Sequence, residues 1–146
     1  MRNTMLGHMS LNVISPMTAE INPGAMDFVK HSVSVYKDFI RPFIPSSSVY
    51  HLNPEWDKAY NNGWSALEIV SDDRGRAAMT ISTLTAAAKD EYRIYPKGLD
   101  RSATYRITID NTGDAFTMAG NEIENIGLRL VIPSSLMSEL VLFERI

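Results

Sequence analysis

Histidine side chains are the first candidates for chemistry in this chain, because an imidazole can bind a metal ion or transfer a proton. The chain contains three of them, His8, His31 and His51, and they lie far apart in the sequence. None has a metal-ligand spacing such as two histidines four residues apart on a helix. The chain also lacks cysteine, which excludes thiolate metal sites, disulfides and a cysteine nucleophile. We therefore interpret the histidines as surface or loop residues, and we expect no metal site and no cofactor.

Paired carboxylates are the second candidates, since most glycosidases use two carboxyl groups that face each other across a cleft. Asp72-Asp73 and Asp90-Glu91 are adjacent pairs in segments with the composition of turns, where carboxylates are usually solvated. Residues 110–114 (Asp-Asn-Thr-Gly-Asp) carry oxygen atoms that suit calcium, but a calcium loop also needs a later glutamate and flanking helices. Strand-like segments flank it instead, so we expect a hairpin turn.

Two nucleophile and phosphate motifs are also missing from the sequence. It has no glycine-rich phosphate loop and no Gly-x-Ser-x-Gly nucleophile elbow. Together with the histidines and carboxylates, this predicts that the chain carries no catalytic residue of its own.

Three aromatic residues form the one suggestive group: Trp56, Tyr60 and Trp64. Exposed aromatic rings can stack on the faces of sugars, which makes these residues candidates for substrate binding. Aromatic residues of a β domain are more often core or interface residues, and that interpretation is the preferred one.

The composition excludes several partners. The chain has 146 residues and a formal net charge of −3, and its basic residues are scattered, which argues against nucleic acid as the main partner. No apolar run approaches the length of a bilayer span, so no membrane partner is expected. The N-terminus lacks the charged-then-apolar pattern of a signal peptide. This is compatible with a chain that begins inside a longer protein. The sequence assigns no cellular compartment.

A single amphipathic helix is predicted in the first third of the chain. Asn22-Pro23 provides an N-cap and a first-turn proline, and Arg41-Pro42 provides a stop, which predicts a helix from about residue 23 to residue 39. Apolar residues recur at intervals of three and four, on one face; they are Met26, Val29, Val33, Tyr36 and Ile40, with Val35 and Phe39 widening the stripe. The preceding segment, residues 4–14, is predicted to form a short buried strand and a loop.

Beyond Ser48 the hydrophobic period changes from helical to strand-like. The predicted strands are residues 49–52, 64–70, 77–84, 92–95, 105–109, 116–118, 128–132 and 140–143, with a helical turn at 121–125. No helices alternate with them, so a doubly wound sheet is excluded. The fold class is therefore mainly β, an antiparallel β-sandwich or barrel preceded by one amphipathic α-helix.

Several motifs, in order and at consistent spacing, resemble the C-terminal region of α-galactosidase-type glycoside hydrolases (family 36 and relatives). The helix end and the strand after it resemble that family's last barrel helix and its Gly-Trp-x-Ala-Leu-Gln strand. Later strands and turns resemble the family's late strand, its glycine pair and its terminal strand. The residues concerned are 35–42 (VYKDFIRP), 63–68 (GWSALE), 105–113 (YRITIDNTG), 120–128 (GNEIENIGL) and 138–144 (SELVLFE). In the glycine pair, Ile123 replaces the usual leucine.

The resemblance implies two parts. Residues 1–44 would be the last strand and helix of a catalytic (β/α)₈ barrel, with the strand and its loop at residues 4–12, and residues 45–146 would be a C-terminal antiparallel β-sandwich. Such enzymes are retaining hydrolases of α-galactosides, and their catalytic aspartates lie on earlier barrel strands, so no catalytic residue carries over. Barrel active sites lie at the C-terminal strand ends, which makes His8, Ser10 and Asn12 candidates for lining the sugar pocket of the intact enzyme.

The leading hypothesis is thus a non-catalytic C-terminal domain that braces the catalytic barrel of the same polypeptide, whose substrate would be an α-galactoside. One alternative is a carbohydrate-binding module that uses Trp56, Tyr60 and Trp64. Another is an oligomerisation domain that joins copies of the enzyme.

Overall fold

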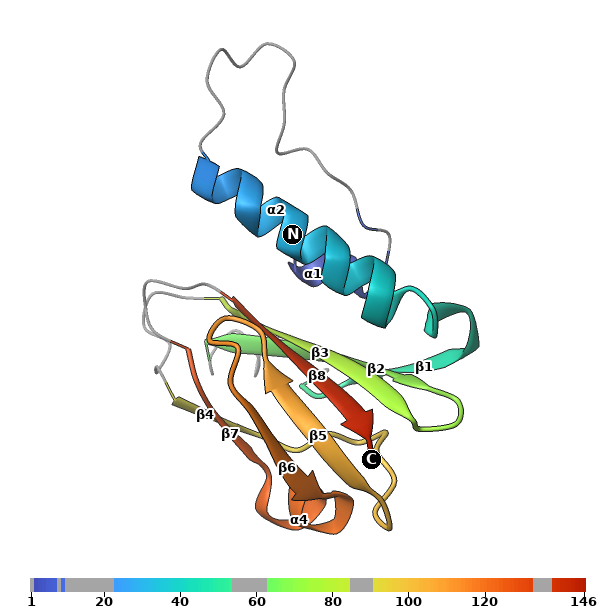
Figure 1. Ribbon diagram of the computed structural model, residues 1–146. Coiled ribbons are helices and arrows are strands. Elements are labelled where there is room, and N and C mark those ends of the chain that lie inside the picture. Colours follow the sequence, from blue (N-terminus) through green and yellow to red (C-terminus); the bar gives the residue numbers. More distant parts are fainter. Residues whose placement is uncertain (1, 8, 10–22, 54–62, 85–90, 133–137) are drawn as a thin grey trace.

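The computed structural model describes residues 2–7, 9, 23–53, 63–84, 91–132 and 138–146. These residues form three layers: a helical layer, a six-stranded antiparallel sheet and a two-stranded sheet (Figure 1). This arrangement confirms the predicted antiparallel sandwich.

The strands coincide closely with the predicted segments. They are β1 (Ser47–His51), β2 (Trp64–Ser71), β3 (Arg76–Thr83), β4 (Glu91–Ile94), β5 (Thr104–Ile109), β6 (Ala115–Ala119), β7 (Leu128–Val131) and β8 (Ser138–Arg145). The strand order is β1-β2-β3-β8-β5-β6 in the large sheet and β4-β7 in the small one. The predicted helical turn is helix α4 (Gly120–Ile126), which connects the two sheets between β6 and β7.

The central strands of the large sheet bury side chains on both faces of the sheet, since alternate side chains of a strand point to opposite sides and both sides are covered. Its inner face meets the small sheet in the main core, to which β3, β5 and β8 contribute Met79, Tyr105, Ile107 and Phe143. Its outer face meets the helical layer through a second apolar cluster. The central strands therefore carry apolar residues at consecutive positions, as Ile69-Val70 and Ala77-Ala78-Met79 do.

The helix is present where it was predicted, with an altered last turn. Helix α2 (Pro23–Val35) continues into a π-helical turn, η1 (Tyr36–Ile40), in which the Arg41 N–H donates to the Tyr36 carbonyl at 2.7 Å. This wider turn brings both Phe39 and Ile40 against the outer face of the sheet. A 3₁₀ turn, η2 (Ile44–Ser46), then leads into β1.

The predicted N-terminal strand is wrong for the residues that the structure describes. Arg2–Met5 form a short helix, α1, and Gly7 N–H bonds back to the Thr4 carbonyl at 3.3 Å. The segment contacts the face of the sheet rather than an edge, so its backbone has no strand to pair with and satisfies its hydrogen bonds locally. Met5 and Leu6 are nevertheless buried, as predicted for this segment, while residues 10–14 lie outside the described part.

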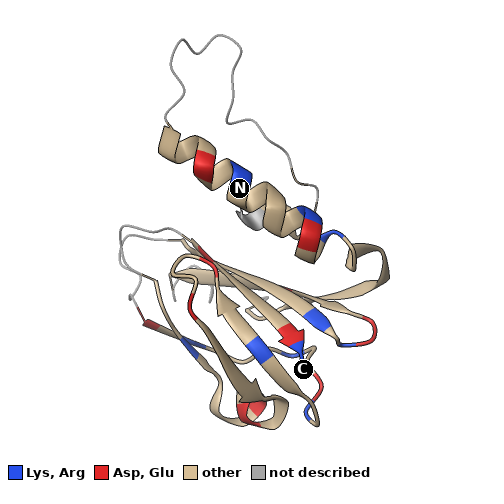
Figure 2. Ribbon diagram, viewed as in Figure 1, with Lys and Arg blue, Asp and Glu red and all other residues tan. Residues whose placement is uncertain are grey.

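No helix among the described residues is long and apolar enough to cross a membrane. Basic and acidic residues are interspersed over the ribbon, which agrees with the absence of a single-sign cluster in the sequence (Figure 2).

Candidate interdomain interface

The structure places one of the six predicted sugar-contacting residues. Trp64 is the first residue of β2; it is half-buried, packs against the main core and meets the Tyr92 ring edge-to-face with centroids 5.6 Å apart. Trp64 is therefore a residue at the edge of the core. The stacking of its ring on a sugar stays a prediction. The other five candidates lie outside the described residues; they are His8, Ser10, Asn12, Trp56 and Tyr60.

The acidic turn residues have structural roles. Asp73 accepts the Ser71 hydroxyl at 2.7 Å and the Gly75 N–H at 2.8 Å within the β2–β3 hairpin. The hydrogen bond from Ser71 and, to a lesser extent, that from the Gly75 N–H hold the pKa of the Asp73 carboxyl below its usual range. The predicted hairpin at 110–114 is confirmed, since Gly113 N–H donates to the Ile109 carbonyl with a φ of 75° at Gly113. Among the described residues, no three His, Asp or Glu side chains gather as a metal site would require.

The best-defined contact surface lies between the helical layer and the large sheet, and we call it the helix–sheet contact. Its buried members are apolar residues from both layers, packed in one cluster: Met5, Leu6, Ile40, Phe43, Ile69, Ala78 and Leu140. Ile40, Ala78 and Leu140 have no exposed surface at all. Burial of this kind stabilises the packing of the helical layer by about 25 cal/mol per Å² of apolar area.

A cation–aromatic contact borders this cluster. The Arg76 guanidinium lies 5.1 Å from the centroid of the Phe39 ring and donates to a carboxylate oxygen of Glu144 at 3.1 Å. Phe39 in turn meets Phe43 edge-to-face at 6.2 Å. One arginine of β3 thus joins the end of the helix to the C-terminal strand.

A second polar contact joins α2 to the sandwich. His31 Nε2 lies 2.7 Å from Asp110 Oδ1, at the end of β5. The Asp110 side chain is only 5% exposed, whereas that of His31 is 53% exposed. The partners are 79 residues apart in sequence, which is why periodicity and motif reasoning did not find this pair.

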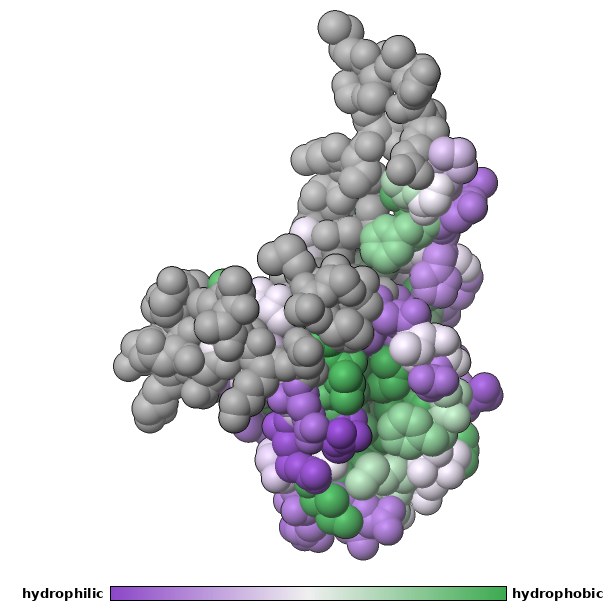
Figure 3. Space-filling model, turned by 90° about the vertical axis from the view of Figure 1, so that its left-hand side faces the viewer, coloured by the Kyte–Doolittle hydropathy of each residue, from purple (hydrophilic) through white to green (hydrophobic). Residues whose placement is uncertain are grey.

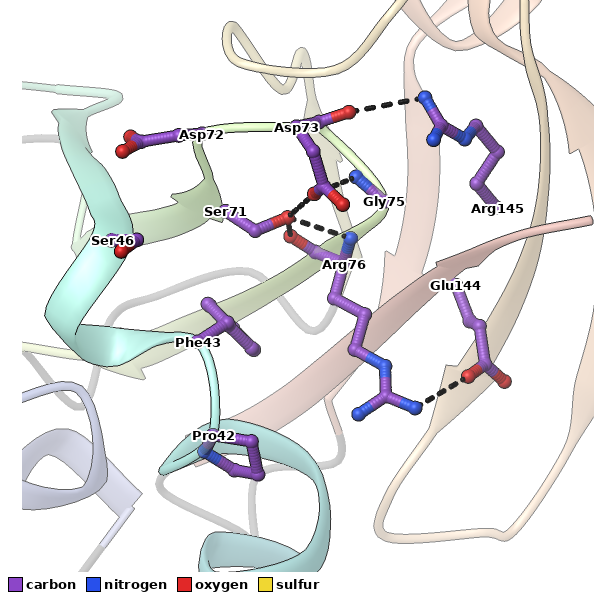
Figure 4. Close-up of a pocket in the computed structure, with 10 residues that line it drawn as sticks. All are labelled: Pro42, Phe43, Ser46, Ser71, Asp72, Asp73, Gly75, Arg76, Glu144 and Arg145. Carbon is purple, nitrogen blue, oxygen red and sulfur yellow. Dashed lines mark hydrogen bonds and ion pairs between the residues drawn. The ribbon is translucent and has the colours of Figure 1, made fainter.

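A pocket of about 660 Å³ opens beside the helix–sheet contact, between the turn after the helix, the β2–β3 hairpin and the end of β8 (Figure 4). Its two arginines hold these segments together. Arg76 bonds Glu144, and Arg145 Nη1 donates to the Asp73 carbonyl at 3.0 Å. The Asp72 side chain points away from this network (Figure 4). Both arginines of the pocket are thus bonded to other lining residues. Its described side chains form neither a pair of opposed carboxylates nor a nucleophile–base pair.

Comparison with protein families gives one match. Residues 64–143, more than half of the chain, match the model of the glycosyl hydrolase family 36 C-terminal domain. None of the curated proteins matches the chain in sequence.

Solved structures with the same fold include three α-galactosidases. The family 36 α-galactosidase AgaA of Geobacillus stearothermophilus is 24% identical, with a TM-score of 0.67 over 87% of this chain and 17% of its own. The α-galactosidase of Lactobacillus brevis is 24% identical, with a TM-score of 0.68 over 87% of this chain and 17% of its own. The galactosidase domain of the α-galactosidase–sucrose kinase AgaSK is 16% identical, with a TM-score of 0.68 over 88% and 17%. The chain therefore spans about a sixth of the length of these proteins.

Proposed function

Because the chain belongs to the family 36 glycosyl hydrolase C-terminal domains, we propose that it braces the catalytic (β/α)₈ barrel of its own polypeptide. The domain is non-catalytic within this family, as the missing catalytic motifs predicted. The observation that carries the bracing role is the helix–sheet contact, in which the large sheet buries apolar residues of its outer face under a helix of a different layer.

We place the boundary between barrel and sandwich near residue 44. The chain leaves the helical layer at Phe43, turns through η2 and enters β1 at Ser47. Residues 1–44 would then be the last unit of the barrel and residues 45–146 the sandwich. The Arg76–Phe39 and His31–Asp110 contacts both cross this boundary, which supports a fixed orientation of the two parts.

The substrate of the intact polypeptide would be an α-galactoside. Solved structures of AgaA variants hold raffinose and stachyose, and this chain shares the fold of their C-terminal part. The catalytic groups would come from the preceding barrel strands. His8, Ser10 and Asn12 would lie near the rim of that barrel and line its sugar pocket.

The test compares the isolated chain with the intact polypeptide on p-nitrophenyl α-galactoside. The purified chain should give no turnover, and the polypeptide encoded with its upstream sequence should hydrolyse the substrate. Turnover that rises in proportion to the purified chain would overturn the non-catalytic assignment. An upstream coding sequence without a barrel carrying two strand-end aspartates would overturn the bracing role.

A second role, in joining copies of the enzyme, is favoured by one surface. The side of the sandwich formed by β4, β6, β7 and α4 exposes large apolar residues, which are Tyr95, Phe116, Ile126 and Val131. Apolar surface is visible on this side in Figure 3, interrupted by hydrophilic residues. Light scattering of the intact enzyme with and without residues 45–146 tests this role. Unchanged oligomeric state on removal of the sandwich would count against it.

A further inference from the structure

The residue that His31 of α2 contacts, Asp110, is held in place by hydrogen bonds within the sandwich. Asp110 directly follows β5, and its N–H donates to the Leu140 carbonyl of β8 at 2.9 Å. The next residue, Asn111, donates through its N–H to Glu139 at 3.0 Å and through its side-chain amide to the Ser138 carbonyl at 2.9 Å. The backbone that carries the Asp110 carboxylate is therefore held by hydrogen bonds to the first residues of β8.

The helix that carries His31 is otherwise lightly packed in the described structure. Within α2 only Val29 and Ser32 are buried, and Val35, its last residue, is the one that packs against the apolar helix–sheet contact. The N-terminal end of the helix lies farther from the sheet than its C-terminal end (Figure 1). A hydrogen bond from His31 therefore contributes to how firmly α2 is held to the sandwich.

We propose that the His31–Asp110 contact is a pH-sensitive fastening of helix α2 to the sandwich. Histidine changes its charge between about pH 5 and pH 8 in proteins. A protonated imidazole donates a charge-assisted hydrogen bond to the nearly buried carboxylate, and such bonds are stronger than neutral ones. Loss of the proton as pH rises leaves a weaker, uncharged contact. The helix is thus held tightly in mildly acidic solution and more loosely in mildly alkaline solution.

The other described charges around this contact are engaged elsewhere. On α2, Lys30 pairs with Asp27 at 3.6 Å, and both side chains are exposed. In the following turn, Asp38 accepts the Ser34 hydroxyl at 2.8 Å, beside exposed Lys37.

From the sandwich, three charged residues lie on the elements around Asp110. The Glu139 carboxylate is occupied by the N–H groups of Asn111 and Leu140. Asp114 closes the same turn with its backbone carbonyl, which accepts the Ile109 N–H at 2.9 Å. Arg106 lies further along β5, on the strand face that the helical layer shares.

Hydrogen–deuterium exchange of the whole chain tests the proposal. The amides of residues 27–35 are measured at about pH 5.5 and about pH 8 and expressed as protection factors, which remove the intrinsic pH dependence of exchange. Protection in the wild-type chain should fall about fivefold between these conditions, the difference expected between a charge-assisted and a neutral hydrogen bond. Amides of β3 and β8 serve as an internal reference and should not change.

Three variants separate this fastening from a general pH effect. His31→Gln should show low protection at both pH values, and His31→Arg, which keeps a positive charge, should show high protection at both. His51→Gln alters an exposed histidine on β1 and should behave as the wild type. Equal pH dependence in the wild type and His31→Gln, or its loss in His51→Gln, would overturn the proposal.

Discussion

Arg76 of β3 rests on the ring of Phe39, with its guanidinium carbon 5.1 Å from the ring centroid. The two residues belong to different layers, because Phe39 lies in the π-helical turn and Arg76 begins a strand of the large sheet. Glu144 binds the same guanidinium from β8 at 3.1 Å. The relationship therefore links the end of the helix, the hairpin strand and the C-terminal strand at one point beside the apolar cluster.

Replacing Phe39 with alanine should weaken the attachment of the helical layer. The substitution removes the ring under Arg76, its edge-to-face contact with Phe43 and its packing against the cluster. Because Phe39 is only half-buried, we expect the free energy of unfolding to fall by about 2 kcal/mol, below the loss for a fully buried phenylalanine. Urea denaturation followed by circular dichroism measures this. Phe116→Ala, on the exposed edge strand β6, is the control and should cost less than about 1 kcal/mol. Equal losses in the two variants would contradict the prediction.

The strands could be predicted because their signals are local. Alternation at Tyr105, Ile107 and Ile109 marks β5 directly, and Asp72-Asp73-Arg74-Gly75 marks the β2–β3 turn. Each of these patterns depends on residues within one strand or one turn. The limits of the helix could be predicted for the same reason, because Pro23 and Arg41-Pro42 restrict the backbone conformation of the residues next to them.

The contacts that join the layers could not be predicted in the same way. Arg76 and Glu144 are 68 residues apart, and nothing in either neighbourhood specifies that β3 pairs with β8. The widened stripe at Phe39 was a signal for the helix–sheet contact, but the π turn that presents this residue is a backbone feature without a local sequence signature. At the N-terminus, buried Met5 predicted a strand, and the lack of a pairing edge produced a helical turn instead.

Gly120 should tolerate no side chain. It begins α4, its N–H donates to the Ala103 carbonyl at 2.8 Å, and a Cβ there would overlap the Asp100 carbonyl oxygen and come within 2.9 Å of its carbon. Because these are backbone atoms of a packed turn, relief requires the backbone to move, and Gly120→Ala should destabilise the fold by about 2 kcal/mol or more. Thermal denaturation measures the loss.

The matched control for this substitution is Gly7→Ala, where a Cβ would meet no atom within 4 Å. This variant should unfold within about 0.5 kcal/mol of the wild type. A Gly120→Ala variant as stable as the control would show that the turn between Asp100 and Gly120 adjusts freely.

Glu68 should make the stability of the wild type fall as pH rises through the weakly acidic range. Burial raises the pKa of its carboxyl above 4.5, although the N–H groups of Lys97 and Gly98 oppose this. A raised pKa in the folded state means that folding favours the protonated form. That stabilisation is therefore fully present below about pH 4.5 and is lost as pH rises through the folded-state pKa.

The Glu68→Gln variant isolates this effect, because glutamine keeps an acceptor for the Lys97 N–H and cannot ionise. Its free energy of unfolding minus that of the wild type should increase between about pH 4 and pH 7, because only the wild type loses stability over this range. Taking the difference cancels groups with the opposite behaviour, such as Asp73 and Asp100, whose pKa values are lowered by hydrogen bonds from Ser71 and Ser102. A difference that is constant over this range would refute the prediction.

The hydroxyl of Tyr105 should contribute strongly to the free energy of unfolding, because it forms hydrogen bonds to two loops. Tyr105 has no exposed surface; its hydroxyl donates to the Arg74 carbonyl at 2.8 Å and accepts the Asp100 N–H at 2.9 Å. Tyr105→Phe leaves both backbone groups without this partner, so we expect a loss of about 2 kcal/mol in the free energy of unfolding.

The loss should come with a local change at the two loops. Amide exchange should rise at Asp100, whose N–H loses its acceptor, and in the β2–β3 turn around Arg74, while α2 keeps its wild-type exchange. Tyr95→Phe is the matched control, since Tyr95 is 47% exposed, and it should unfold as the wild type does. If both variants lose the same stability, the effect belongs to the tyrosine ring in general and not to the bridge between Arg74 and Asp100. A loss confined to Tyr105→Phe, with faster exchange at both loops, would establish that this one hydroxyl holds the β2–β3 turn against the loop before β5.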